Sequence, residues 1–135
     1  MLKGSCMCGS IRYEAEGPLS LVACCHCVQC RKASGAEFAT NGNVPAATFR
    51  VVAGAELLSS FSITPGKARH FCARCGSPLF KKSEDSPDVV RLRLGALDTD
   101  EDVHPVAHAF VSEKPRWSVI HDDLPQFPRL PERPR

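Results

Sequence analysis

The sequence lacks the features of a membrane or secreted protein. None of the apolar runs in its 135 residues approaches the roughly 20 residues that a membrane-spanning helix needs. The first residues, Met-Leu-Lys-Gly-Ser-Cys, contain no apolar stretch of signal-peptide length. We therefore expect a cytoplasmic location and no membrane partner.

The sequence also lacks an excess of charge of either sign. Its 17 Lys and Arg residues and 15 Asp and Glu residues give a formal net charge of +2. If seven cysteines bind two zinc ions as thiolates, their seven negative charges and the four positive charges of the metals bring the total to about −1. A nearly neutral domain gives no electrostatic reason to expect nucleic acid as a partner.

Length and composition are those of one compact domain. With 43% hydrophobic and 24% charged residues, the chain resembles ordinary globular proteins of this size. The C-terminal end differs, since prolines 125, 128, 131 and 134 recur at every third residue. That spacing would align them along a polyproline II helix that could dock in an aromatic groove. We favour the alternative of an extended tail, and expect a domain over 1–127 and a Pro-rich tail over 128–135.

Most of the chain reads as short strands separated by turn signals. The clearest strand-like segments are residues 11–15, 19–23, 47–52, 57–63 and 89–94. Gly17-Pro18, Asn41-Gly42-Asn43, Pro65-Gly66 and Ser86-Pro87 indicate turns. Only residues 28–34 read as a helix, which should end at Gly35. The pattern predicts a mainly β fold of antiparallel strands with one short helix.

Eight cysteines are the most informative feature of the sequence. Disulfides are rare in a reducing compartment, which leaves metal binding, catalysis or redox chemistry. Cys72-Ala-Arg-Cys75-Gly76 has the spacing of a zinc knuckle, and Cys6-Met-Cys8-Gly9 is a tighter pair that also ends in glycine. Together the two pairs predict a closed four-cysteine zinc site that ties the N-terminus to the middle of the chain. The alternative is a CxxC redox dithiol, which usually occurs in a βαβ setting that this chain lacks.

A second cluster, Cys25-His26-Cys27-Val28-Gln29-Cys30, places three thiols at the start of the short helix. Three protein ligands with an exchangeable fourth position are typical of a catalytic zinc, and four closed ligands of a structural zinc. Cys24 or a histidine could instead complete the shell. Neighbours on an extended strand point to opposite faces, so Cys24 and His26 should point away from the other sulfurs. We expect Cys24 to be a small core residue.

Other side chains could serve the same chemistry. Arg31 and Lys32 follow the second cluster and could attract carboxylates of an anionic thiol, although such a pair is often solvated surface charge. His70 and His108 could shuttle protons, but a histidine in such a place is more often a hydrogen-bonded packing residue. Trp117 and Phe110 are expected in the core.

Three blocks of sequence resemble the signature of a known family. They are Gly4-Ser-Cys-Met-Cys-Gly9, Cys25-His-Cys-Val-Gln-Cys-Arg-Lys-Ala-Ser-Gly35 and Phe71-Cys-Ala-Arg-Cys-Gly-Ser-Pro-Leu79. Weaker matches follow in order at residues 95–98, 108, 114–117 and 123–127. The chain is similar over roughly residues 3–127 to the glutathione-dependent formaldehyde-activating enzyme family, which includes centromere protein V.

The resemblance implies a β-tent fold of antiparallel sheets with a zinc knuckle. It assigns Cys6, Cys8, Cys72 and Cys75 to a structural zinc, and Cys25, Cys27 and Cys30 to a catalytic zinc. The implied reaction is that of S-(hydroxymethyl)glutathione synthase, a carbon–sulfur lyase that condenses formaldehyde with glutathione. Nothing carries over to Cys24, which lies outside the pattern.

Two other functions remain open at the level of sequence. Both zinc ions could be structural in a non-enzymatic module that binds protein or nucleic acid, although the chain has no basic tail to favour this role. A redox or zinc-buffering protein would rest on the number of thiols alone. The resemblance and the three-cysteine spacing together favour the zinc-dependent lyase acting on a small glutathione-like thiol.

Overall fold

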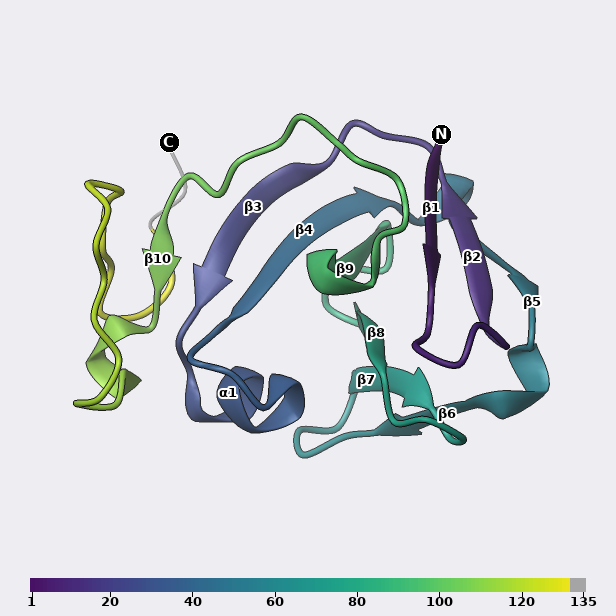
Figure 1. The fold of residues 1–135 in the computed structure, drawn as a ribbon, viewed down its shortest axis with the longest axis horizontal. Helices are drawn as coiled ribbons and strands as arrows, with labels where there is room; N and C mark the ends of the chain where they lie inside the picture. The colour runs from purple at the N-terminus through teal and green to yellow at the C-terminus, as the bar shows by residue number, and fades with distance from the viewer. Residues whose placement is uncertain (132–135) are drawn as a thin grey trace. The chain divides into compact units, whose positions relative to one another are not determined.

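The computed structural model describes residues 1–131 of the chain, which form two sheets, one α-helix and four short 3-10 helices (Figure 1). The structure divides into two compact units. The first contains residues 1–20 and 42–102, and the second contains residues 21–41 and the chain from 103 onward. No helix in the described part of the chain is long and apolar enough to cross a membrane.

The first unit contains a three-stranded antiparallel sheet in the order β1-β2-β5. Its strands are β1 (Leu2–Ser5), β2 (Arg12–Ala15) and β5 (Arg50–Ala53). Leu2 pairs with Ala15 and Ser5 with Arg12, so the loop that joins β1 to β2 is short and carries Cys6 and Cys8. On strand β1 the burial alternates, with Leu2 and Gly4 inside, which is the pattern of a sheet with one covered face.

A second run of strands in this unit follows the order β9-β8-β7-β6. Their bounds are β6 (Leu58–Phe61), β7 (Lys67–Cys72), β8 (Pro78–Ser83) and β9 (Val89–Arg93). The pairs β6–β7, β7–β8 and β8–β9 are antiparallel. The hairpin of β7 and β8 holds Cys72 at the end of one strand and Cys75 in the connecting turn.

The core of the first unit packs around Tyr13, Phe80 and Leu92, which are at most 1% exposed. Tyr13 and Phe49 lie 5.4 Å apart between ring centroids, and Phe49 and Phe80 lie 4.7 Å apart. Two of the cysteines, Cys6 and Cys72, belong to this same buried cluster. These two side chains are therefore part of the hydrophobic core of the first unit.

The second unit contains β3 (Ser20–Cys25, with Ser20 itself in the first unit), α1 (Val28–Ser34) and β10 (His108–Ala109). Strand β4 (Ala39–Pro45) passes from this unit into the first. β10 pairs with β3 in parallel, His108 opposite Cys24 and Ala109 opposite Cys25. Figure 1 shows α1 directly after the end of β3.

The mainly β fold with one α-helix is confirmed. The helix covers the predicted residues 28–34 and ends at Gly35, whose φ of 66° and N–H bond to the Arg31 carbonyl form a left-handed cap. The strand pairs β1–β2, β2–β5, β6–β7, β7–β8 and β8–β9 are antiparallel as expected, and β10–β3 is a parallel pair. The expectation of a turn at residues 41–43 is wrong, because these residues lie within β4.

The C-terminal segment is held by backbone bonds as far as Arg129. The Phe127 N–H donates to the His108 carbonyl at 2.9 Å, and the Phe110 N–H donates to the Arg129 carbonyl at 3.0 Å. Residues 132–135 of the 128–135 tail, which include Pro134 of the proposed polyproline repeat, lie outside the described residues. The boundary at residue 127 stays a prediction.

Candidate metal centres

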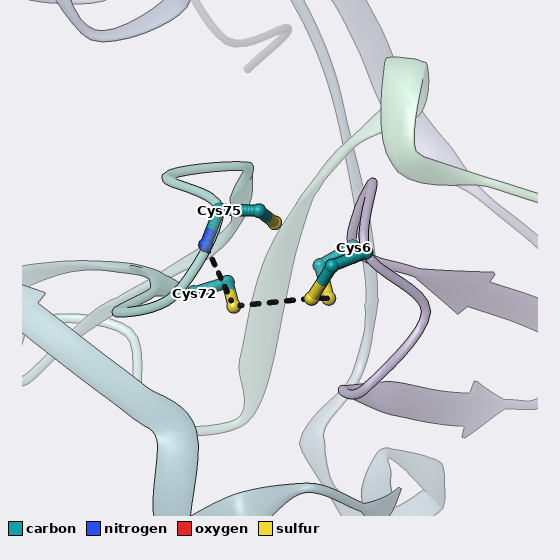
Figure 2. Close-up of side chains that lie close together, drawn as sticks. Cys6, Cys72 and Cys75 are labelled. Atoms are coloured by element: carbon teal, nitrogen blue, oxygen red, sulfur yellow. Dashed lines mark hydrogen bonds between the residues drawn. The ribbon is translucent and has the colours of Figure 1, made fainter.

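The first centre gathers four cysteines from two loops of the first unit. Cys6 and Cys8 come from the turn after β1, and Cys72 and Cys75 from the turn between β7 and β8. Their four sulfur atoms lie within 4.8 Å of one another. Figure 2 shows the side chains of Cys6, Cys72 and Cys75 pointing toward one another across this space.

The spacing of these sulfurs fits a tetrahedral zinc. Ligand distances of about 2.3 Å place tetrahedral thiolates about 3.8 Å apart. The Cys6 and Cys8 sulfurs are 3.5 Å apart, and those of Cys8 and Cys72 are 3.9 Å apart. Four thiols in such proximity without disulfide bonds are suited to a soft divalent cation.

Backbone N–H groups donate hydrogen bonds to sulfurs of the first centre, which favours their charged form. Burial and the neighbouring Cys75 and Cys6 thiols nevertheless leave the pKa of Cys72 raised. The Cys72 sulfur accepts bonds from the Arg74 and Cys75 N–H groups, each at 3.4 Å, and the Cys6 sulfur accepts one from Ile11 at 3.3 Å. Figure 2 shows the bond from the Cys75 N–H to the Cys72 sulfur as a dashed line. Hydrogen bonds from Ser77 lower the pKa of Cys75 to about 5. Donors that favour the charged form prepare this loop to bind a metal.

Glycine allows both knuckle turns to close. Gly9 has a φ of 76° and Gly76 a φ of 79°, a region that other residues rarely adopt. The Gly9 N–H donates to the Cys6 carbonyl at 2.9 Å, and the Gly76 N–H donates to the Cys72 carbonyl at 2.8 Å. The two turns are therefore built alike, as the sequence pattern of cysteine followed by glycine predicts.

The second centre lies at the junction of β3 and α1. Cys25 ends the strand, Cys27 is the N-cap of the helix, and Cys30 lies in its first turn and is 5% exposed. The Cys27 sulfur accepts the Cys30 N–H at 3.3 Å, which is the bond expected of an N-cap side chain. The three sulfur atoms lie within 4.8 Å of one another.

Among the described residues, no histidine, carboxylate or further cysteine joins this group of three. Cys24 is buried elsewhere, 4% exposed, with its sulfur 3.9 Å from the Thr40 hydroxyl. Burial raises the pKa of its thiol, as expected for a core cysteine. The expectation that Cys24 is a small core residue is confirmed.

The donor set of the second centre fits a cation. Hydrogen bonds with the Cys27 and Cys30 side chains raise the pKa of Cys25, and burial raises it further. Three thiols so close together cannot all ionise at neutral pH without positive charge among them. A zinc ion would supply that charge, and an all-sulfur shell would suit it.

Two histidines and an aspartate form a hydrogen-bonded chain beside the second centre. His26 Nε2 lies 2.8 Å from His108 Nδ1, and His108 Nε2 lies 3.0 Å from both oxygens of Asp122. His26 is fully buried and His108 is 3% exposed. Burial, with the neighbouring His108, lowers the pKa of His26. Sequence reasoning missed Asp122, since no motif marks it, and did not connect His26 with His108.

Two members of this chain, His108 and Asp122, border a cavity of about 420 Å³. Its lining includes Cys24, Phe38, Thr40, His108 and Asp122. The Asp122 carboxylate is half-exposed, and the Leu124 N–H bonds to one of its oxygens at 3.0 Å. That N–H and then His108 keep the pKa of Asp122 below its ordinary value, so this carboxylate is charged.

The other candidate residues have different surroundings. A terminal nitrogen of Arg31 donates to the Glu113 carbonyl at 3.3 Å, while Lys32 is exposed. His70 stacks on Phe80 with ring centroids 4.6 Å apart, as a packing residue would. Trp117 is 66% exposed, so the expectation that it lies in the core is wrong.

The comparison with known proteins bears on these cysteine centres. Residues 1–113 match the model of the family described as glutathione-dependent formaldehyde-activating enzyme, a span that includes both centres. The chain belongs to this family. A curated relative in it, the putative glutathione-dependent formaldehyde-activating enzyme of Halomonas elongata, is 36% identical over 129 residues, covering 89% of this chain and 81% of that protein.

A solved structure extends the family comparison to the fold. A crystal structure of a Rhodobacter sphaeroides protein matches with a TM-score of 0.63 and 24% sequence identity. The match covers 74% of this chain and 91% of that protein. It supports the fold alone, because the sequences are too different to carry a function.

Proposed function

We propose that this chain is a zinc-dependent carbon–sulfur lyase of the S-(hydroxymethyl)glutathione synthase type. Its substrates would be formaldehyde and glutathione, or a related aldehyde and small thiol. The family and the name of the Halomonas elongata relative support the glutathione-dependent reaction. We further propose a cytoplasmic location, and no nucleic acid or membrane partner.

The observation that carries the proposal is the difference between the two cysteine centres. One gathers four sulfurs and the other three, with no further ligand atom from the described residues in the smaller group. Four protein ligands close a zinc site, whereas three leave a position for a substrate. We therefore assign Cys6, Cys8, Cys72 and Cys75 to a structural zinc, and Cys25, Cys27 and Cys30 to the catalytic centre.

The residues of the three-cysteine centre suit activation of a thiol. Zinc bound there supplies an exchangeable position at which a thiol would have a lowered pKa. Three cysteine thiolates already donate charge to the metal and weaken its pull on a carbonyl oxygen, so we favour thiol activation over carbonyl polarisation. The glutathione sulfur then attacks the formaldehyde carbon to form the C–S bond. The carbonyl oxygen becomes the hydroxyl group by taking up the proton that the thiol lost.

Arg31 and Lys32 would attract the carboxylates of glutathione. Replacing both with Ala should raise KM for glutathione several-fold at low salt, and the difference should shrink as ionic strength rises. Activity titrated with glutathione at two salt concentrations measures this. Lys3→Ala, which removes one exposed charge from strand β1, is the control. An unchanged KM at low salt would show that the two side chains are only solvated surface charge.

Zinc-edge X-ray absorption with and without glutathione tests the open position. The protein should contain two zinc ions, one bound to four sulfurs and one to three. Adding glutathione should raise the mean number of sulfur ligands per zinc from about 3.5 to about 4, the mean of these two shells. A second zinc that already has four protein ligands and is unaffected by the thiol would favour a zinc-stabilised binding module instead.

A further inference from the structure

The hydrogen-bonded chain of Asp122, His108 and His26 leads from a half-exposed carboxylate to the loop of the three-cysteine centre. Its two contacts measure 3.0 Å and 2.8 Å between heavy atoms, which are good hydrogen-bond distances. Asp122 is 49% exposed, whereas His108 is 3% exposed and His26 is fully buried. Every link lies within the second unit, which also holds Cys25, Cys27 and Cys30.

For neutral imidazoles the bonds of this chain have one direction. A charged carboxylate only accepts, so His108 Nε2 carries a proton and donates it to Asp122. His108 Nδ1 is then an acceptor, and it receives the Nε2–H group of His26. The remaining nitrogen, His26 Nδ1, is left as an unprotonated acceptor. It is buried and has no hydrogen-bond partner among the described residues.

The orientation of the His26 ring affects two of the proposed zinc ligands, Cys25 and Cys27. His26 stands between Cys25 and Cys27 in the sequence, so its backbone torsions set the separation of their sulfurs. The His26 N–H donates to the Ala109 carbonyl at 2.9 Å, and its ring centroid lies 4.9 Å from that of Phe38. His26 is thus held by its backbone bond to Ala109, by Phe38 against one face of its ring and by His108 at Nε2. These three contacts together fix the conformation of the turn from Cys25 to Cys27.

We propose that Asp122 and His108 are positioning residues for the three-cysteine centre, and that they act by fixing the tautomer and orientation of the His26 ring. The inference rests on the proposed zinc at that centre. Hydrogen-bonded groups outside a metal shell commonly orient the ligands in this way, and their loss typically weakens metal binding about 10- to 100-fold. Here the oriented group is the residue between two ligands rather than a ligand.

Asp122→Asn is the first test. The Leu124 N–H already bonds to Asp122 Oδ1, so the amide nitrogen of asparagine would take the place of Oδ2, 3.0 Å from His108 Nε2. An amide donor beside a protonated Nε2 would bring two N–H groups together. The hydrogen bonds should therefore reverse, so that His108 donates through Nδ1 and His26 carries its proton on Nδ1. ¹⁵N imidazole shifts of the zinc-loaded protein report this tautomer directly. Zinc affinity at the three-cysteine centre, measured by chelator competition, should fall about tenfold.

Two further variants separate positioning from charge and from loss of the fold. Asp123→Asn removes the same charge from the neighbouring, exposed carboxylate and should leave both measurements unchanged. His108→Gln removes the central imidazole of the hydrogen-bonded series Asp122–His108–His26, and should weaken zinc binding at the three-cysteine centre as well. In every variant, dispersed amide NMR signals from β3 and β10 show that the second unit is folded, and zinc retained at the four-cysteine site shows the same for the first unit.

The outcomes distinguish this inference from the proposed function. Suppose that the wild-type protein binds two zinc ions and that the Asp122→Asn variant binds zinc at the three-cysteine centre with the same affinity. This result would overturn the positioning role and leave the proposed function intact. The positioning role would also be overturned if the His26 tautomer changed while the zinc affinity of the three-cysteine centre stayed the same. A wild-type protein that binds zinc only at the four-cysteine site would overturn the proposed function, and this inference with it.

Discussion

Replacing Cys72 with Ser should remove one zinc ion and unfold the first unit. Cys72 is fully buried in the hydrophobic cluster, and its sulfur is 3.9 Å from that of Cys8. Structural zinc binding contributes on the order of 10 kcal/mol in zinc-finger peptides. That is comparable to the whole free energy of unfolding of a domain, about 5–15 kcal/mol. Zinc content and thermal unfolding followed by circular dichroism measure the loss.

Cys24→Ala is the matched control for Cys72→Ser. Both change a buried cysteine, but Cys24 lies outside the two sulfur groups. This variant should keep two zinc ions and lose only about 1 kcal/mol of stability, the cost of a small cavity. If Cys72→Ser kept two zinc ions and melted like Cys24→Ala, the four-cysteine site would not be a metal site.

Replacing Cys27 with Ser should remove the other zinc ion and leave the fold intact. Serine is a good N-cap, so its hydroxyl can replace the sulfur as acceptor of the Cys30 N–H. It is a poor zinc ligand beside thiolates. Formation of S-(hydroxymethyl)glutathione should slow by on the order of a hundredfold or more, since ligand loss exceeds the effect of an outer-shell change. Zinc content, melting temperature and activity are measured together.

A comparison of two substitutions at Cys27 isolates its role as a ligand. Cys27→Ala also removes the cap, and should cost about 1 kcal/mol of stability more than Cys27→Ser. Both variants should hold one zinc ion and be equally inactive. An active Cys27→Ser protein would contradict the assignment of the three-cysteine centre as the catalytic one.

Local chemistry explains why part of the fold was predictable. The helix at residues 28–34 ends at Gly35, a glycine with positive φ, and this stop signal is readable in the sequence. Its N-cap, Cys27, is not one of the residue types that predict a helix start. The cysteine pairs were equally readable, because a knuckle needs its two sulfurs and its glycine within a few residues. The prediction that the two pairs share one metal follows from the four ligands that a closed zinc site requires.

Features that depend on tertiary contacts were not predictable. Residues 41–43 read as a turn, but Asn41 is 2% exposed inside β4 and the Asn43 side chain accepts a bond from Arg91 at 2.8 Å. Side chains from β9 thus allow a turn-like sequence to extend as a strand. The polar strand β7 (Lys67–Cys72) was missed for a related reason, since its residues are mostly half-exposed.

The environment of the second centre shows the same limit. The three cysteines are adjacent in sequence and were identified together. His26 and His108, however, are 82 residues apart, and Asp122 is 14 residues further along. Only the parallel pairing of β10 with β3 brings His108 beside this loop. Parallel pairs require long connections, which leave no local trace in the sequence.

We propose that the three-cysteine centre catalyses the condensation of a thiol with formaldehyde, and the rate of that reaction tests the proposal. Exchange NMR with ¹³C-formaldehyde and glutathione measures how fast hydrated formaldehyde and S-(hydroxymethyl)glutathione, a hemithioacetal, interconvert. This interconversion also proceeds without a catalyst. A small amount of the two-zinc protein should accelerate this exchange, and the same amount of Cys27→Ser protein should not. An exchange rate that is the same with the two-zinc protein, with Cys27→Ser and with buffer would show that this centre does not catalyse the condensation.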